Sequence, residues 1–397
     1  MKKNNTKIYD IIFLVIIILI LIIGLVKVLT KSNENNYYEN RKSYQLPKIT
    51  LNTIKNKQYQ NNIELALADQ LPVAIIMKKV HNFLNVLNIN LITDFIYQDN
   101  CRNTYMPIQT GLTKFGCDNN LVFNTENLID NQKLLDNNIE NYNKYIENYN
   151  NIDFYLYYIE KDTDLNLENN SKNLVYEYIK ENINIKEKNI NRFEIKNANE
   201  FIKYFYKTDH HWNHKGSYKA YKEVVTMMKS GTLLLEPIQE KCFSKSKFKG
   251  SKALIIGGGS LIFKEKFCVY DFKIPKHITM INGKICKNDN IINKSNITTK
   301  EINYAKFYGN DNGLTYFDFN QPKKDNLLII GDSYDNALNK LIATHYNKTY
   351  NIDLRNYERE MKQPFLFDEF IKTNNINDVL LIGNIDFYRI DTFTLKG

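Results

Sequence analysis

A serine stands directly after an apolar run near the C-terminal end of the 397-residue chain, in the sequence LLIIGDSY at residues 327–334. A buried strand followed by a helix would place Ser333 at the carboxyl edge of a sheet, where α/β proteins form their sites. Gly331 would allow a tight turn. The N–H groups at the helix start could stabilise an oxyanion, and a serine there is also a common helix cap without chemistry. The pattern therefore makes Ser333 a candidate nucleophile, with Asp332 bracing the turn.

The segment TDHHWNH, residues 208–214, holds three of the six histidines and the single tryptophan of the chain. In an extended segment, side chains two positions apart face the same side. Asp209 would then orient His211 and fix the tautomer that a general base needs beside a serine. Together the two segments supply a nucleophile, a base and an orienting acid.

Two other interpretations of this histidine segment remain open. His210 and His214 are four residues apart and would align on a helix as metal ligands. Gly216 and the lack of a glutamate inside the motif weaken that interpretation, and we expect neither a metal nor another cofactor. The structural alternative is a helix entry capped by Asp209 or Asn213, which leaves the two adjacent histidines unexplained.

Predicted strands and helices alternate along the chain around these segments. The apolar patterns predict strands at 152–159, 326–330, 350–354 and 379–382, and helices at 126–150, 172–205, 334–346 and 364–372, with another helix directly after the histidines. Such alternation predicts a parallel sheet with helices on its faces. Residues 231–320 differ, with short apolar runs, turn signals and three of the five cysteines. We expect this part to be an insertion or a β-rich subdomain.

The N-terminal segment predicts a membrane anchor. Lys2, Lys3 and Lys7 precede an apolar run that begins at Ile11, close to the ~20 residues that a spanning helix needs. No small-x-small cleavage site follows the run, and an apolar surface all round it disfavours a buried core helix. We expect a signal anchor at 8–29, a tether at 30–45 and an extracytoplasmic domain at 46–397. The protein would thus be a single-pass protein of the cell membrane.

Charge argues against one class of partner, and the cysteine content leaves the disulfides open. The net charge of +9 is spread along the chain, without a basic helix or an aromatic RNA motif, so we expect no nucleic-acid partner. Cys101 and Cys117 could close a short loop by a disulfide, whereas scattered buried cysteines explain the five equally well.

Three stretches resemble the DHHW proteins of Gram-positive bacteria, a branch of the SGNH hydrolase-like group that includes the periplasmic alginate O-acetylation proteins. They are NKQYQNNIELALADQLPVA at 56–74, TDHHWNHKGSYKAY at 208–221 and GDSYDNALNKLIATHYNKTYNIDLRNY at 331–357. In the alginate proteins a D-x-H motif precedes the serine and completes its triad, and Asp209, His211 and Ser333 match those positions. Ordinary SGNH hydrolases have the reverse order, which a triad defined by geometry tolerates.

The resemblance implies an α/β fold of the SGNH-hydrolase type, a three-layer sandwich with a parallel sheet. Asn384, in LIGN at 381–384, looks like the G-x-N block that contributes to the oxyanion hole, although here the glycine directly precedes the asparagine. We expect Ser333, Tyr334 and Asn384 to form that hole. Arg355, His210 and Trp212 are candidate substrate-binding residues.

The expected function is acyl-ester chemistry on a cell-surface glycan, with O-acetyl transfer through the triad as the first expectation. A transferase would also need a multi-spanning membrane protein that delivers the acyl donor. The same triad would serve a carbohydrate esterase. A non-catalytic glycan-binding or scaffold role in the cell envelope is the third possibility.

Overall fold

A computed structural model describes residues 2–30, 35–36, 41–42, 44–45, 49–70, 74–91, 104–105, 111–117, 120–243, 247–248, 250–255, 265–286 and 301–397. The chain folds as two compact units. The first comprises residues 1–111, 116–118 and 251–263, and the second comprises residues 112–115, 119–250 and 264–397.

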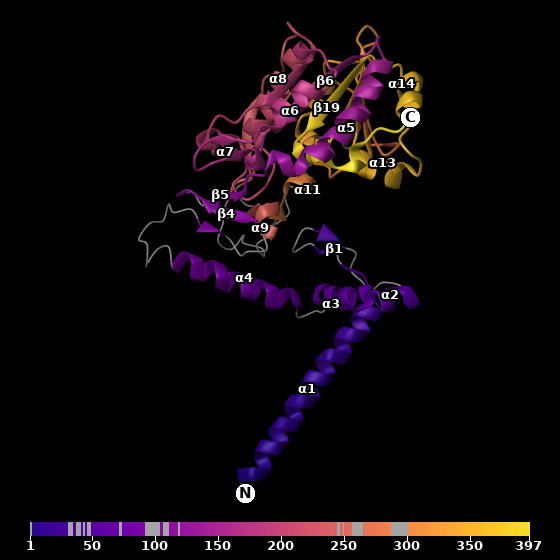
Figure 1. Cartoon of the computed structure of the whole chain (residues 1–397). Helices are drawn as coiled ribbons and strands as arrows, with labels where there is room; N and C mark the ends of the chain where they lie inside the picture. Colours follow the sequence, from indigo (N-terminus) through magenta and orange to yellow (C-terminus); the bar gives the residue numbers. More distant parts are fainter. Residues whose placement is uncertain are drawn as a thin grey trace. The chain divides into compact units, whose positions relative to one another are not determined.

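The first unit is mainly helical (Figure 1). Its elements are α1 (Lys2–Thr30), β1 (Asn35–Asn36), β2 (Arg41–Lys42), α2 (Leu51–Lys55), α3 (Gln58–Gln70), α4 (Ala74–Leu91), β3 (Thr104–Tyr105) and α9 (Ser251–Ile255). The apolar side chains of α1 from Ile11 to Ile23 are exposed. Among the described residues, no helix meets the length and hydropathy required to cross a membrane. The anchor at 8–29, the tether and the domain boundaries stay predictions.

The second unit is built on one eight-stranded sheet. Its strands are, in spatial order, β14 (Lys284–Ile285), β13 (Ile278–Ile281), β16 (Leu314–Asp318), β18 (Lys348–Ile352), β17 (Asn326–Gly331), β19 (Asp378–Gly383), β6 (Asp153–Ile159) and β9 (Ile190–Phe193). The five strands from β18 to β9 are parallel, whereas β16 pairs antiparallel with β18 and β13 with β16. The sheet is therefore mixed, not purely parallel as predicted, because strands from residues 231–320 extend it.

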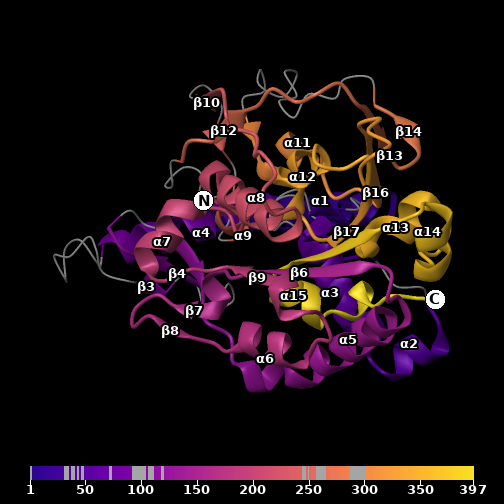
Figure 2. The ribbon, with the colours of Figure 1, turned by 90° about the horizontal axis from the view of Figure 1, so that it is seen from above.

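Helices cover both faces of this sheet. They are α5 (Leu128–Asn148), α6 (Val175–Asn182), α7 (Ala198–Tyr204), α8 (His214–Met228), α11 (Tyr304–Tyr308), α12 (Asn339–Ala343), α13 (Leu354–Met361), α14 (Phe367–Thr373) and α15 (Ile385–Arg389). Figure 2 shows α8 and α12 on one side of β6 and β17, and α5, α6 and α15 on the other. This confirms an α/β fold with a large central sheet.

The strand pattern explains why both faces are covered. Along β17, Leu327 and Ile329 belong to the core on the α8 side, while Leu328 and Ile330 belong to the core on the α5 side. Successive side chains of a strand point to opposite faces, so a strand that is apolar at every position must be buried on both. β6 and β19 alternate in the same way.

Several predicted elements differ from the observed ones. The region 172–205, for which helices were predicted, contains the strand β9 between α6 and α7. This four-residue strand lies at the edge of the sheet, beside β6. The predicted helix at 334–346 is a 3-10 turn at Asp335–Ala337 followed by the short α12. The predicted strand at 350–354 ends at Ile352, and α13 starts at Leu354.

Four small strand pairs complete the second unit, and a disulfide joins the strands of one of them. They are β4 (Leu112–Phe115) with β5 (Asn120–Phe123), β7 (Leu165–Asn166) with β8 (Ser171–Lys172), β10 (Gln239–Cys242) with β12 (Cys268–Asp271), and β11 (Lys247–Phe248) with β15 (Glu301–Ile302). Cys242 and Cys268 form a disulfide between β10 and β12, a pairing that sequence reasoning missed. Cys101 lies outside the described residues, so its pairing with Cys117 remains a prediction.

Candidate active site

Ser333 lies at the carboxyl edge of the sheet, two residues beyond the end of β17. The chain passes very close to its neighbours there, because a Cβ at Gly331 would lie 2.0 Å from Oδ2 of Asp335 and 3.0 Å from the carbonyl oxygen of Ile382. Glycine therefore fits at position 331, where any side chain would overlap Asp335 and Ile382. Ser333 itself is half-buried, so its hydroxyl is held by the fold at an accessible edge.

The histidine segment approaches this edge as a loop between α7 and α8. Phe205 and Trp212 form a β-bridge, and the N–H of Tyr206 donates to the carbonyl of His211 at 3.1 Å. Inside the loop, Oδ1 of Asp209 accepts from the backbone N–H of His211 at 3.0 Å and lies 2.6 Å from its ring Nδ1. The carboxylate therefore holds both the backbone and the ring of His211.

The other ring nitrogen of His211 faces the serine. Nε2 of His211 lies 2.8 Å from Oγ of Ser333, across 122 residues of sequence. Burial by itself would raise the pKa of Asp209, but the charge of His211 and the hydrogen bonds from its ring and backbone N–H hold that pKa below its ordinary value. A carboxylate, an imidazole and a hydroxyl in this order can activate the hydroxyl as a nucleophile.

Asp332 braces the turn, as expected. Its Oδ1 accepts from the backbone N–H of Tyr334 at 2.9 Å, and its Oδ2 accepts from Nδ2 of Asn384 at 3.2 Å. Burial raises the pKa of Asp332 to about 6, against the opposing charge of Arg355 and the hydrogen bond from Tyr334. Two of the three predicted oxyanion-hole donors, Tyr334 and Asn384, thus donate to a carboxylate next to the serine.

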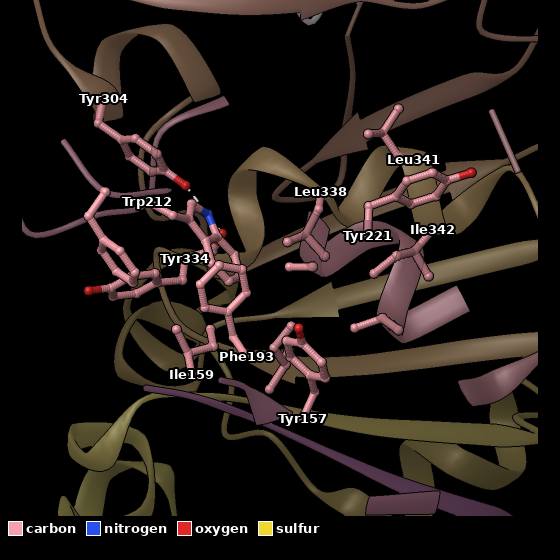
Figure 3. Close-up of a cluster of buried hydrophobic side chains, with 14 of the residues drawn as sticks. Tyr157, Ile159, Phe193, Trp212, Tyr221, Tyr304, Tyr334, Leu338, Leu341 and Ile342 are labelled. Atoms are coloured by element: carbon pink, nitrogen blue, oxygen red, sulfur yellow. Dashed lines mark hydrogen bonds between the residues drawn. The ribbon is translucent and has the colours of Figure 1, made fainter. Parts of the chain in front are cut away.

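The three candidate substrate-binding residues have different surroundings. His210 is accessible, with 32% of its side chain exposed and its ring centroid 3.8 Å from that of His211. Trp212 is 0% exposed and packs edge-on against Phe193 and Tyr334 (Figure 3). The substrate-binding prediction for Trp212 is therefore wrong, because an indole in the core cannot reach a ligand.

Arg355 lies in the first turn of α13 and is already paired. Its guanidinium donates to both carboxylate oxygens of Asp353, through Nε at 2.9 and 3.2 Å and through Nη2 at 2.6 Å. Asp353 also caps the helix by accepting from the backbone N–H of Arg355 at 3.0 Å. About a third of the Arg355 side chain is exposed, and its contact with substrate stays a prediction.

The metal interpretation fits the structure less well than the triad. His214 begins α8, where Asn213 caps the helix by accepting from the N–H groups of Lys215 and Gly216, so His210 lies outside that helix. Nε2 of His214 instead lies 2.8 Å from Oε1 of Glu240. Asp209, His210 and His211 do offer ligand atoms within 4.8 Å of one another. However, both ring nitrogens of His211 are engaged by Asp209 and Ser333.

Two residues at the site were not found from the sequence. The ring of Tyr304 lies parallel to the imidazole of His211, with centroids 3.7 Å apart and planes 4° from parallel. Glu265 accepts hydrogen bonds from the backbone of Lys207 and Thr208, directly before Asp209. Both belong to residues 231–320, and no motif in that part of the sequence marks them.

The fold is shared with proteins of known structure. A DHHW family protein from Eubacterium siraeum is 16% identical with a TM-score of 0.58, and the match covers 72% of this chain and 97% of that one. Bacillus cereus PatB1 with a sulfonyl adduct is 17% identical with a TM-score of 0.55 and the same coverage. The O-acetyltransferase domain of Pseudomonas putida AlgJ is 10% identical with a TM-score of only 0.39, over 73% of this chain and 94% of that one.

The likenesses to the Eubacterium siraeum protein and to PatB1 establish a common fold. A comparison with curated protein sequences gave no match. The sequence profile of the DHHW protein family matches residues 133–352, more than half of the chain, and this range includes the histidine segment, Ser333 and every strand of the central sheet except β19. The chain belongs to the DHHW protein family.

Proposed function

We propose that this protein is an acyl-ester enzyme that transfers an O-acetyl group to a cell-surface glycan, with Ser333 as nucleophile, His211 as general base and Asp209 as the orienting acid. One observation carries the proposal: the two contacts of 2.6 and 2.8 Å that link Asp209, His211 and Ser333 into one chain. All three groups occupy the edge of an α/β sheet where such sites form.

The proposed reaction has two balanced halves. In the first, Nε2 of His211 takes the hydroxyl proton of Ser333 while Oγ attacks the carbonyl carbon of an activated acetyl ester. The tetrahedral oxyanion then collapses, the donor's alcohol leaves with the proton from His211, and the acetyl group stays on Oγ. In the second half, a sugar hydroxyl gives its proton to His211 and attacks the acetyl carbonyl. This restores the Ser333 hydroxyl and releases the sugar ester.

The oxyanion needs hydrogen-bond donors beside Ser333. The backbone N–H of Ser333 is one candidate. Tyr334 and Asn384 both donate to Asp332 in the resting arrangement, so their use would require a bond to Asp332 to lengthen. The side chains of His210 and Arg355 are each about a third exposed, and these residues remain the candidates for contacting the acceptor.

Transfer, rather than hydrolysis, rests on the resemblance of the triad segments to the alginate O-acetylation proteins. The sulfonyl adduct of PatB1 suggests a sulfonylating reagent as a second probe of Ser333.

Location outside the cytoplasm and anchoring through residues 8–29 remain part of the proposal, as does a multi-spanning membrane protein that delivers the acetyl donor. The Cys242–Cys268 disulfide supports this location, because disulfides persist in oxidising compartments. Removal of the domain from intact cells by an added protease would test it.

Intact-mass spectrometry of the full chain in detergent tests the chemistry. The protein is exposed to p-nitrophenyl acetate or to phenylmethylsulfonyl fluoride, beside Ser333→Ala and, as a matched control, Ser171→Ala at an exposed strand. We expect one adduct in the native chain and in Ser171→Ala, and none in Ser333→Ala. An unchanged adduct in Ser333→Ala would exclude this serine as the nucleophile.

The same preparation separates the alternatives. With an oligosaccharide acceptor, a transferase yields acetylated sugar, whereas an esterase yields only acetate. If a folded native chain forms no adduct and turns over no ester, the proposed chemistry is wrong. Glycan binding that survives substitution of all three triad residues would then favour a scaffold role.

A further inference from the structure

We propose that residues 231–320, beyond adding strands to the sheet, hold the general base in place, with Tyr304 and Glu265 as positioning residues. Tyr304 would fix the imidazole of His211, and Glu265 would fix the backbone next to Asp209. This inference rests on the proposed function, because it assigns these residues to the same Ser333–His211–Asp209 site.

Tyr304 covers one face of the imidazole. Its ring lies 3.7 Å from that of His211 at an interplanar angle of 4°, and the tyrosine is only 2% exposed. Its hydroxyl donates to the backbone carbonyl of Tyr334 at 3.2 Å, beside the serine. The Tyr304 side chain thus contacts both the ring of His211 and the backbone of the residue that follows Ser333. Because the stack restricts rotation of the imidazole, it favours the orientation in which Nε2 faces Ser333.

The stack also affects the charge that forms during the reaction. When His211 takes the serine proton it becomes an imidazolium, and a cation over the face of an aromatic ring is stabilised by the ring's quadrupole. Tyr304 is therefore placed to favour the charged form more than the neutral one. A merely space-filling side chain would not do this.

Glu265 holds the backbone that leads into the acid. Its carboxylate accepts three hydrogen bonds: from the N–H of Lys207 at 2.5 Å, the N–H of Thr208 at 2.9 Å and the hydroxyl of Thr208 at 2.7 Å. Thr208 is buried and directly precedes Asp209. A charged acceptor of several N–H and O–H groups gives stronger and better defined bonds than a neutral one.

The surrounding packing comes from the same region. A Cβ at Gly250 would lie 2.1 Å from the carbonyl oxygen of Thr208, so the two backbones are in direct contact. The rings of Phe248 and Phe267 pack against Tyr206, with centroids 4.7 and 5.6 Å away. The base-carrying loop is thus held from its start at Tyr206 to His211 by one region of the chain. Small misplacements of catalytic groups, of about 1 Å, can cost about 100-fold in rate.

Steady-state hydrolysis of p-nitrophenyl acetate by the full chain, measured from pH 5 to 9, tests the proposal. For Tyr304→Leu we expect kcat to fall about 10- to 100-fold at unchanged KM. The acid limb of the pH–rate profile should also move to lower pH, because the imidazolium loses its stacked ring. Tyr304→Phe keeps the ring and should stay within about threefold of the native rate. Glu265→Gln should lower kcat most above pH 7, because burial raises the pKa of Glu265 to about 7 and its carboxylate is ionised above that pH.

Tyr308→Leu is the matched control, because Tyr308 lies on the same short helix and packs on Tyr304 and Phe307. If Tyr308→Leu lowers kcat and moves the acid limb as far as Tyr304→Leu does, the effect is one of general loosening and the proposal fails. A native kcat and a native pH profile in Tyr304→Leu would also overturn it.

A second measurement does not depend on activity. In the histidine-labelled full chain, the stacked ring of Tyr304 should shift the His211 ring protons upfield, and Tyr304→Leu should remove that shift, with His211→Ala giving the assignment. Absence of the shift in the native chain would overturn the stacking, whatever the activity. If the shift is present but no ester reacts at Ser333, the proposed function fails and the assignment of Tyr304 and Glu265 as positioning residues falls with it.

Discussion

Nδ2 of Asn384 lies 3.2 Å from Oδ2 of Asp332, and this hydrogen bond joins the carboxyl ends of β19 and β17 beside the serine. Asn384 also caps α15, since its Oδ1 accepts from the N–H of Asp386 at 2.8 Å. Both residues are buried. A single amide therefore connects two central strands and starts the next helix.

Replacing Asn384 separates these two contributions. Asn384→Ala should lower the free energy of unfolding by about 2–4 kcal/mol, because it removes a cap and leaves a buried carboxylate short of a donor. Asn384→Ser keeps a capping oxygen and should lose about 1 kcal/mol less. Urea unfolding measures both variants. Equal losses would show that the cap contributes nothing.

Asp209→Asn tests the orientation of the base. An asparagine can present its NH2 group to Nδ1 of His211 and so favour the tautomer that carries the proton on Nε2. We expect kcat/KM for p-nitrophenyl acetate to fall by about 10³- to 10⁴-fold. Asp130→Asn, an exposed residue in the first turn of α5, is the control and should leave the rate unchanged. A loss below about tenfold in Asp209→Asn would contradict the assigned role of Asp209.

Two buried carboxyl groups should make stability depend on pH. Burial raises the pKa of Asp164 from 3.8 to about 7, and that of Glu265 from 4.5 to about 7. Between pH 4 and 7 the native state then binds more protons than the unfolded state, so these groups make the free energy of unfolding fall as pH rises through this window. Their contribution is complete below pH 4 and lost above pH 7.

Urea unfolding at pH 5, 6, 7 and 8 measures this slope. Asp164→Asn and Glu265→Gln should each be less stable than the native chain, yet each should show a shallower fall of stability with rising pH. A stability that rises from pH 5 to 7, or a slope that neither variant changes, would show that these carboxyl groups titrate normally.

The disulfide between Cys242 and Cys268 should contribute to stability. It closes a loop with a sequence separation of 26, for which about 3 kcal/mol is typical. We expect a reducing agent to lower the free energy of unfolding by at least about this amount, and to lower it less in the double variant Cys242→Ser, Cys268→Ser, where only the predicted Cys101–Cys117 disulfide would still respond. Cys286→Ser removes a free thiol and should behave as the native chain does. An equal response to reductant in the double variant would contradict this contribution.

Much of the second unit could be predicted from local patterns. β6, β17 and β19 were recognisable because a parallel strand buried on both faces must be apolar at almost every position. α5 and α8 were recognisable from their helical apolar spacing. Since parallel strands end at one edge, a serine directly after a strand could be placed at that edge.

The sequence by itself thus determined the central parallel strands, their helices, and the family motifs that carry Asp209, His211 and Ser333. Tertiary structure alone decided that the sheet is mixed, that Trp212 is in the core, that Asn384 donates to Asp332, that Tyr304 stacks on His211 and that Glu265 accepts from the backbone before Asp209. The physical reason is the range of the interactions involved. Periodicity reports how neighbours along one element share a face, whereas these contacts join residues tens to more than a hundred positions apart, and their spacing in sequence carries no periodic signal.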